Sequence, residues 1–320
     1  MKILVTGGAG YIGSHCVFSL LKNGYDVVIF DNLSTGQENF LSSAQENTRF
    51  KFIRGDILNI EDLKSAMSGS DFVFHFAANA DIRDNLKHPK FVFEQNAIGT
   101  FNVLEAMRAN NIKFIAFSST GSVYGEPEIF PTPEIAPFPV QTSLYAASKD
   151  FGEGMIESYC SGYNFTGYIF RFVSLLGERY PHGHVFDFVK SLLRDPKHLT
   201  IIGNGHQKKS YLYIQDCLDA ILTAINNCHE IGQSYIFNLG SNEYCEVKDS
   251  AKWISQRMNL SPEFEFTGGL RGWTGDSPFI WLDTEKIRSL GWQNKLSIKQ
   301  SVEKTVDYLL ANKWLMEARS

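Results

Sequence analysis

A glycine-rich segment near the N-terminus places the strongest constraint on the fold. Gly7, Gly10 and Gly13 have the spacing G-x-x-G-x-x-G, directly after an apolar run that predicts a buried strand and at the start of an apolar-periodic helix. Glycine permits a tight turn here and lets the backbone approach a pyrophosphate, which then lies at the positive end of the helix. The segment therefore predicts a dinucleotide site at the first strand–helix junction of an α/β sheet.

An acidic residue in the next predicted strand–loop junction supports this site. Asp31 follows the expected strand Asp26 to Phe30 and lies 18 residues beyond Gly13. Its carboxylate can accept hydrogen bonds from the adenosine ribose and would repel a 2′-phosphate, which favours NAD over NADP. Asp56, after another expected strand, is a candidate to bind the adenine amino group, or equally a helix N-cap.

Strands and helices alternate along the first half of the chain. This alternation predicts an α/β fold, a doubly wound parallel sheet of the Rossmann type with right-handed crossovers. The expected strands are Lys2 to Val5, Asp26 to Phe30, Lys51 to Arg54, Phe72 to Phe76 and Phe114 to Ser118, and the expected helices are Ile12 to Lys22, Asp62 to Met67, Phe91 to Asn110 and Ser143 to Ser161.

A proline-rich segment and a change of pattern divide the chain. Residues 126–139 carry five prolines and predict an irregular loop. Beyond Gly177 short elements mix, with helices expected at Phe186 to Arg194 and Asp216 to Asn227 and strands at Leu199 to Ile202 and Tyr235 to Leu239. We expect residues 1–176 to form the NAD-binding domain and residues 177–320 a smaller, discontinuous substrate lobe, part of which returns to the main sheet.

Composition excludes several classes of protein. The chain has 320 residues, of which 43% are hydrophobic, and a formal net charge of −5, which argues against a nucleic-acid partner. No apolar run approaches the roughly 20 residues that span a bilayer, so no membrane partner is expected. The five cysteines are scattered and odd in number, and Met1 leads within three residues into a strand, leaving no room for a signal peptide. Together these features favour the cytoplasm.

A tyrosine and a lysine four residues apart suggest a catalytic pair. Tyr145 and Lys149 would lie on one face of the expected helix. A free tyrosine has a pKa near 10, and a nearby ammonium together with the positive nicotinamide of NAD⁺ would favour its phenolate. Lys149 should also bind the nicotinamide ribose, and Thr120, at the end of an expected strand, can relay a proton between a substrate hydroxyl and Tyr145. The alternative is a surface Tyr–Lys pair.

Ordered motifs over nearly the whole chain resemble those of the extended short-chain dehydrogenase/reductase family. Within it the chain is similar to the nucleotide-sugar epimerase/dehydratase group, and most to UDP-glucose and UDP-glucuronate 4-epimerases. The motifs are Thr6 to His15, Asp31 to Gly36, His75 to Ala78, Asn96 with Gly99 and Thr100, Ser122 to Gly125, and Tyr145 to Lys149.

The resemblance implies a set of NAD-binding residues beyond those above. It adds positions along the glycine segment, in the loop after the second strand and at the ends of later strands. The full set is Gly7, Gly10, Tyr11, Ile12, Gly13, Asp31, Asn32, Ser34, Gly36, Asp56, Ile57, Phe76, Ala77, Ala78, Asn96, Ser118, Tyr145, Lys149 and Val173.

The residues after Thr120 bear on the reaction. The group's 4,6-dehydratases carry Asp-Glu there, whereas this chain has Gly121 and Ser122, so the resemblance implies epimerisation at C4 through a transient 4-keto sugar. Two alternatives stay open. One is a nucleotide-sugar reductase or C2-epimerase acting on a CDP-, dTDP- or GDP-linked sugar; the other is a non-catalytic NAD-binding regulatory protein.

Substrate positions are also implied by resemblance. Lys209 stands where an arginine usually holds the diphosphate, and Arg271 and Asp276 resemble later residues that hold phosphate and ribose. Arg83 and Ser122 resemble the uronate-binding positions, which keeps UDP-glucuronate beside UDP-glucose and UDP-galactose as substrates. The remaining candidates are Thr120, Ser174, Phe186, Thr200 and Ile202. As alternatives, Lys208 and Lys209 form a solvated turn, and Arg83 forms a structural salt bridge.

Two further expectations concern metals and assembly. His182 and His184 lack a third ligand nearby in sequence, so no metal is expected, and a role in closing the substrate lobe is favoured. Relatives often dimerise through two helices per subunit. The resemblance therefore implies a homodimer formed by the helices Phe91 to Asn110 and Ser143 to Ser161.

Overall fold

A computed structural model describes residues 1–80, 87–137, 141–272 and 277–318. The chain divides into two compact units that interleave along the sequence. Unit 1 comprises residues 1–125, 138–171 and 221–237, and unit 2 comprises residues 126–137, 172–220 and 238–320. The domain boundary at residue 176 stays a prediction.

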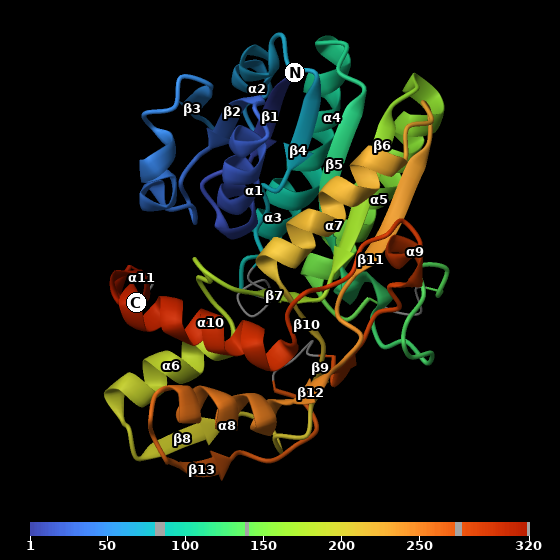
Figure 1. The fold of residues 1–320 in the computed structure, drawn as a ribbon. Helices are drawn as coiled ribbons and strands as arrows, with labels where there is room; N and C mark the ends of the chain where they lie inside the picture. The colour runs from blue at the N-terminus through green and yellow to red at the C-terminus, as the bar shows by residue number, and fades with distance from the viewer. Residues whose placement is uncertain (81–86, 138–140, 273–276, 319–320) are drawn as a thin grey trace. The chain divides into compact units, whose positions relative to one another are not determined.

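Unit 1 is built on a seven-stranded parallel sheet with the strand order β11-β6-β5-β4-β1-β2-β3 (Figure 1). The predicted doubly wound α/β fold is therefore confirmed. The carboxyl ends of parallel strands share one edge, so Thr6, Asp31, His75 and Thr120 end neighbouring strands at that edge. The strands are β1 (Lys2–Thr6), β2 (Asp26–Asp31), β3 (Phe50–Arg54), β4 (Phe72–His75), β5 (Phe114–Thr120), β6 (Thr166–Phe172) and β11 (Ser234–Leu239).

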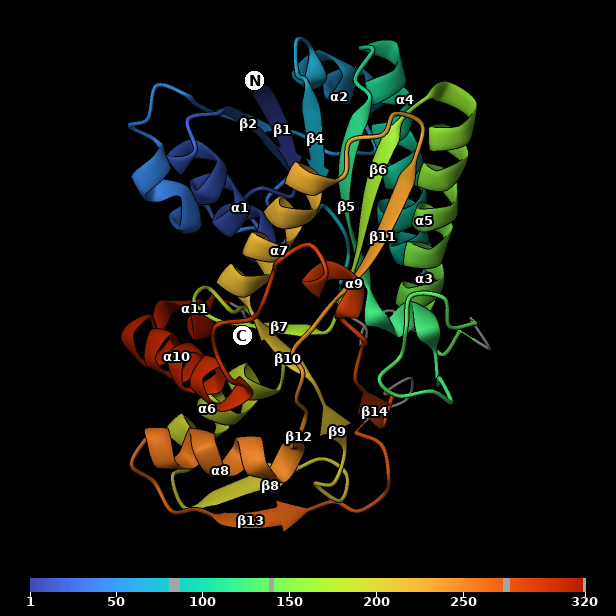
Figure 2. The ribbon, with the colours of Figure 1, turned by 45° about the vertical axis from the view of Figure 1, so that its right-hand side comes forward.

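Helices cover both faces of this sheet. Figures 1 and 2 show α1 (Tyr11–Lys22) on one face and α2 (Ile60–Met67), α4 (Gly99–Ala109) and α5 (Leu144–Tyr163) on the other. Side chains from the second group of helices, such as Leu63, Val103 and Ile156, form one hydrophobic cluster with strand residues. Short elements complete the unit: η1 (Glu38–Ala44), α3 (Pro89–Phe93), η2 (Glu94–Ile98) and η3 (Gly121–Tyr124).

The helix expected over residues 91–110 is interrupted. The segment begins as α3, widens into the π-helix η2, and continues as α4. Apolar periodicity does not distinguish a continuous α-helix from one with a wide turn, because the extra residue shifts the phase only once.

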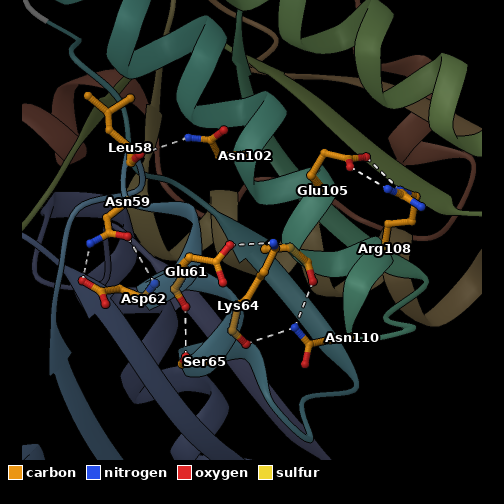
Figure 3. A network of polar contacts seen from close by, with 11 residues as sticks. Leu58, Asn59, Glu61, Asp62, Lys64, Ser65, Asn102, Glu105, Arg108 and Asn110 are labelled. Carbon is orange, nitrogen blue, oxygen red and sulfur yellow. Dashed lines mark hydrogen bonds and ion pairs between the residues drawn. The ribbon is translucent and has the colours of Figure 1, made fainter.

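Hydrogen bonds from polar side chains connect α4 to α2 and to the residues before it (Figure 3). Asn59 caps α2 by accepting from the backbone N–H of Asp62. Asn102 on α4 donates to the carbonyl of Ile57 at 3.0 Å and of Leu58 at 3.4 Å, and Asn110 donates to the carbonyl of Lys64 at 3.0 Å. These bonds satisfy carbonyls in and before α2 that would otherwise lose hydrogen bonds on burial.

Unit 2 is a mixture of short strands and amphipathic helices. Its strands pair as β7 with β10, as β12-β9-β14, and as β8 with β13, while α6, α8 and α10 pack together. The strands are β7 (Ser174–Leu176), β8 (His198–Ile201), β9 (Lys208–Lys209), β10 (Tyr211–Tyr213), β12 (Cys245–Glu246), β13 (Glu263–Phe266) and β14 (Phe279–Ile280), and the helices are α6 (His184–Arg194), α7 (Ile214–Asn227, shared with unit 1), α8 (Val247–Arg257), α9 (Glu285–Arg288), α10 (Ile298–Ala311) and α11 (Trp314–Glu317). Within the described ranges, no helix is both long and apolar enough to cross a membrane.

The contact between α5 and β5 gives a test of the packing. A Cβ at Gly152 would lie 2.8 Å from Cζ of the fully buried Phe117, whereas a Cβ at Gly154 would meet nothing within 4 Å. Gly152→Ala is therefore expected to lower the free energy of unfolding by about 1–3 kcal/mol through overpacking. Gly154→Ala on the same helix should raise it by up to about 1 kcal/mol. Urea denaturation measures both, and equal stability of the two variants would contradict this packing.

Candidate functional site

The glycine segment brings three backbone segments into close contact. Gly7 has a φ of +69°, and a Cβ there would lie 2.6 Å from the backbone nitrogen of Ala77. A Cβ at Gly13 would lie 2.1 Å from the carbonyl oxygen of Gly7. Any side chain would therefore push apart the end of β1, the residues after β4 and the first turn of α1.

Helix α1 starts at Tyr11, and its N-cap, Gly10, has no side chain to bond the first N–H groups. Such a helix N-terminus binds an anion well, because unsatisfied N–H groups and the helix dipole both favour negative charge.

A cavity of about 280 Å³ opens beside this turn. Its wall combines residues from the glycine turn, the loop after β2 and the residues after β4. The predicted cofactor residues that line it are Gly7, Gly10, Asp31, Asn32, Ser34, Ile57, Phe76, Ala77 and Ala78. Six residues that the motifs did not predict also line the cavity, and one of them, Thr35, lies inside the motif Asp31 to Gly36; the six are Phe30, Thr35, Gly55, Asn79, Phe91 and Gln95.

Asp31 joins the glycine turn to the loop after β2. Its carboxylate accepts from the backbone N–H of Ala9 at 2.9 Å and of Leu33 at 2.8 Å. Burial raises the pKa of Asp31, while these two N–H groups oppose the rise. The residue lines the cavity as expected, and its contact with a ribose stays a prediction.

Asp56 supports the same loop. Its carboxylate accepts from Nδ2 of Asn32 at 2.9 Å and from the N–H of Leu58 at 2.9 Å. Interpreting Asp56 as the helix N-cap is wrong, because Asn59 caps α2. Its bond to an adenine amino group stays a prediction.

Helix α5 carries Tyr145 and Lys149 one turn apart. The helix is capped by Ser143, whose hydroxyl accepts from the N–H of Ala146 at 3.1 Å. Lys149 is only 2% exposed, and its Nζ lies 4.6 Å from the ring centroid of Phe117. A surface pair is therefore the wrong interpretation.

Burial dominates the titration of this pair. It raises the pKa of Tyr145 to about 12 and lowers the pKa of Lys149 to about 7, the latter opposed by the carboxylate of Glu153. The protein alone thus favours a neutral phenol, and stabilisation of the phenolate by Lys149 and NAD⁺ stays a prediction.

The end of β5 presents hydroxyl groups. Ser118 donates to the carbonyl of His75 at 3.3 Å, and Thr120 is buried at the last position of the strand. Thr120 Oγ1 accepts from the N–H of Ser122 at 3.1 Å, which starts the 3-10 turn η3.

The buried His75, which was not predicted to be functional, connects the glycine turn at Gly7 to η2. Thr100 donates its hydroxyl proton to the carbonyl of Asn96 at 2.6 Å, so it accepts from Nε2–H of His75 at 3.0 Å. Nδ1 of His75 must then accept from the hydroxyl of Thr6 at 2.7 Å, and Thr6 Oγ1 lies 3.4 Å from the N–H of Ala77. These bonds assign one neutral tautomer to His75.

Asn96 carries the connection onward to α5. Its side chain binds Asn79 through both backbone groups, at 2.7 and 3.0 Å, and donates to Oγ of Ser148 at 2.9 Å. Ser148 in turn donates to the carbonyl of Tyr145 at 2.7 Å. Asn96 therefore positions neighbouring site residues, a role that its motif alone does not reveal.

The remaining predicted residues belong to unit 2 or lie outside the described residues. Lys209 is half-buried in β9 and donates to the carbonyl of Ser277, so interpreting Lys208 and Lys209 as a solvated turn is wrong. Arg271 pairs with Glu126 at 2.6 Å. Arg83 and Asp276 fall in the segments 81–86 and 273–276, outside the described residues.

Other unit 2 candidates differ in exposure. Val173 and Phe186 are buried, whereas Ser174, Thr200 and Ile202 are exposed, and Thr200 donates to Glu265 at 3.4 Å. Their contacts with a substrate stay predictions.

His184 belongs to the packing of unit 2. Its Nε2 lies 2.7 Å from Oγ of Ser250, and its ring centroid lies 4.8 Å from that of Tyr211.

Comparison with known proteins identifies the family. The model of the "NAD dependent epimerase/dehydratase family" matches residues 3–240. The chain belongs to this family. A UDP-glucose 4-epimerase of Mycolicibacterium smegmatis is 32% identical over 316 residues, which cover 96% of this chain and 98% of that protein.

Two solved structures are similar throughout. The UDP-glucose 4-epimerase of Thermotoga maritima, solved with UDP-glucose, has a TM-score of 0.88 and 31% identity, covering 98% of this chain and 100% of that one. A UDP-glucuronic acid 4-epimerase of Bacillus cereus has a TM-score of 0.88 and 29% identity, covering 97% and 99%. The latter carries a tyrosine-to-phenylalanine substitution and is in complex with UDP-4-deoxy-4-fluoro-glucuronic acid and NAD.

The residues of unit 1 fit the cofactor of this family. The turn at Gly7 and Gly13 leaves no space for a Cβ, the N-terminus of α1 is open to an anion, and Asp31 and Ile57 line the adjoining cavity. NAD is therefore the cofactor that this site accommodates.

The buried His75 predicts a pH dependence of stability. Burial and the nearby Lys149 lower the pKa of His75 to about 3, so between about pH 6.5 and pH 3 the unfolded chain binds a proton that the folded protein does not. The free energy of unfolding should thus fall as the pH falls below about 6.5. In His75→Gln this fall should be shallower by about 1.4 kcal/mol per pH unit, measured by urea denaturation between pH 4.5 and 7. His229→Gln, at an exposed site, is the control; parallel curves for all three proteins would refute the assignment.

Proposed function

We propose that this protein is an NAD-dependent UDP-sugar 4-epimerase. The observation that carries the proposal is the Tyr145–Lys149 pair on α5, whose lysine is buried, in the unit that also holds the glycine turn and its cavity. The UDP-glucose 4-epimerase relatives, which match over nearly the full chain, support the choice of reaction and nucleotide.

Tyr145 acts as the general base. Its phenolate takes the proton of the C4 hydroxyl, and the ammonium of Lys149 stabilises that phenolate. The hydroxyl of Thr120 passes the proton between the sugar and Tyr145. NAD⁺, when bound, would supply the acceptor, and in its reduced form the donor, of the hydride at C4.

Inversion needs a sugar that can turn over while its nucleotide stays bound. The C4 centre becomes a planar ketone, and the epimer forms when hydride is returned to the other face of C4 and Tyr145 returns a proton to the C4 oxygen. We assign the nucleotide and diphosphate to Lys209, Arg271, Asp276, Phe186, Thr200 and Ile202, and the sugar to Arg83, Thr120, Ser122 and Ser174.

Epimerisation is favoured over dehydration by the residues that follow Thr120. Gly121 and Ser122 form the first turn of η3 and supply no carboxyl group. Elimination of water needs an additional acid and base, which these residues lack.

Incubation with a panel of nucleotide sugars tests the proposal. Purified protein is given UDP-glucose, UDP-galactose, UDP-glucuronate and a CDP-sugar, with and without added NADH, and products are identified by NMR. We expect the C4 epimer of a UDP-sugar, with no net change in absorbance at 340 nm. Tyr145→Phe should lower kcat by at least about 10³-fold while NAD remains bound.

Each rival function has its own outcome. Stoichiometric consumption of reduced cofactor would indicate a reductase, and a C2 epimer from a CDP-sugar would indicate the other alternative. Bound NAD without turnover of any sugar would indicate a regulatory protein. Unchanged turnover in Tyr145→Phe would remove Tyr145 from the mechanism.

We also propose that the protein is a homodimer. Large apolar side chains are exposed on the helices expected to form the interface: Phe93, Ile98, Phe101 and Phe151 are 53%, 37%, 39% and 43% exposed. The α3–η2–α4 segment packs on α5, so these side chains lie on one layer of unit 1. Clustered apolar exposure of this kind favours association.

Charge on this layer should break the dimer. Phe101→Glu combined with Phe151→Glu is expected to convert dimer to monomer, because each carboxylate would be buried without a partner. Sedimentation velocity gives the mass. Leu193→Glu on α6, at a residue 42% exposed, is the control and should leave the mass unchanged. A wild-type protein that sediments as a monomer would contradict the proposal.

A further inference from the structure

Unit 1 contains a buried ion pair one helical turn beyond Lys149 along α5. Arg171 on β6 and Glu153 on α5 are each 3% exposed in their side chains, and Nη2 of Arg171 lies 2.6 Å from Oε2 of Glu153. Nε of Arg171 adds two bonds of 3.1 Å to the same carboxylate. Nη1 of Arg171 donates to the hydroxyl of Tyr124 at 2.8 Å. A carboxylate so deep in the protein requires this pairing.

The same carboxylate reaches the strand that carries the site's hydroxyl groups. Oε1 of Glu153 accepts from the hydroxyl of Ser119, which stands between Ser118 and Thr120 at the end of β5. Glu153 also lies one helical turn after Lys149 on α5. It therefore touches β5 and β6 and shares a helix face with Lys149.

The charge of Glu153 opposes the effect of burial on Lys149. Burial lowers the pKa of Lys149, and Glu153 is the carboxylate that raises it. Within the part of the chain that the structure describes, the other titratable groups around this lysine supply no such charge: His75 on β4 is neutral, Tyr145 is a phenol, and Arg171 is a cation engaged by Glu153. Asp150 and Glu157 also interact electrostatically with Glu153.

We propose that Glu153 is a positioning residue of the site, whose carboxylate keeps Lys149 cationic beside Tyr145 while it holds the hydroxyl-bearing end of β5 against α5. This inference rests on the proposed function, since it assigns Lys149⁺ the stabilisation of the phenolate. A purely structural ion pair would stabilise the fold without affecting the protonation of Lys149.

The pH dependence of activity in Glu153→Gln distinguishes a positioning role of Glu153 from a purely structural one. Glutamine keeps the length and an acceptor oxygen for Ser119 and Arg171, but it removes the charge. Lys149 then loses its proton at lower pH, so the loss in kcat/KM should be at least about two-fold greater at pH 8.5 than at pH 6. Glu157→Gln, one turn further along α5 and exposed, should leave the pH profile unchanged. A loss in Glu153→Gln that is equal at both pH values overturns the proposal.

A second readout does not depend on activity. Because the folded pKa of Lys149 is about 7 and lies below that of the unfolded chain, the free energy of unfolding should rise with pH above about 7. In Glu153→Gln this rise should begin at least about half a pH unit lower. The background Lys149→Met should abolish the difference. Coincident curves for the wild type and Glu153→Gln overturn the proposal, whereas a wild type inactive on every sugar overturns only the proposed function.

Folding of the variant is controlled separately. If Glu153→Gln leaves Arg171 too poorly paired to fold, the double variant Glu153→Gln/Arg171→Met removes both charges. The proposal expects a shift of the Lys149 transition in the same direction in this variant, and an unshifted transition overturns it.

Discussion

The close approach of backbone at Gly7 is the constraint on which the rest of unit 1 depends. It lets the end of β1 meet the residues that follow β4, and this brings Thr6 within hydrogen-bonding distance of His75. From there a continuous series of buried polar bonds reaches Asn96 and then the first turn of α5. The glycine turn beside the cofactor cavity and the helix that carries Tyr145 are thus placed by one connected network.

Burial gives this site its chemistry as well as its shape. A lysine that is 2% exposed has lost most of its hydration, so its charge depends on the few groups that touch it. In water one neighbouring carboxylate would change the pKa of a lysine only slightly. In the interior of unit 1 the carboxylate of Glu153 opposes the desolvation that lowers the pKa of Lys149.

The parts of the site that follow from local spacing could be predicted from the sequence. Gly7, Gly10 and Asp31 belong to one strand–helix–strand segment and line the same cavity. Tyr145 and Lys149 lie four residues apart on a single helix, so their spacing alone places them on one face. The roles of His75, Glu153 and Arg171 depend on partners far along the chain, such as Thr6 for His75, and no periodicity encodes such contacts. Strands as short as β9, β12 and β14 carry too few residues for an alternating pattern, which explains why the sequence does not predict them.

The wide turn η2 also has a consequence for how this protein can tolerate change. A π-helical turn contains one residue more than an α-helical turn, and Asn96 occupies it with bonds to both Asn79 and Ser148. Deletion of a single residue between Glu94 and Ile98 would let the segment close into a regular α-helix that keeps α3 and α4 in line, but the wide turn that presents the Asn96 side chain would be lost. Point substitutions on the surface of this segment are mild by comparison, whereas a one-codon deletion would remove the asparagine from both of its neighbours at once.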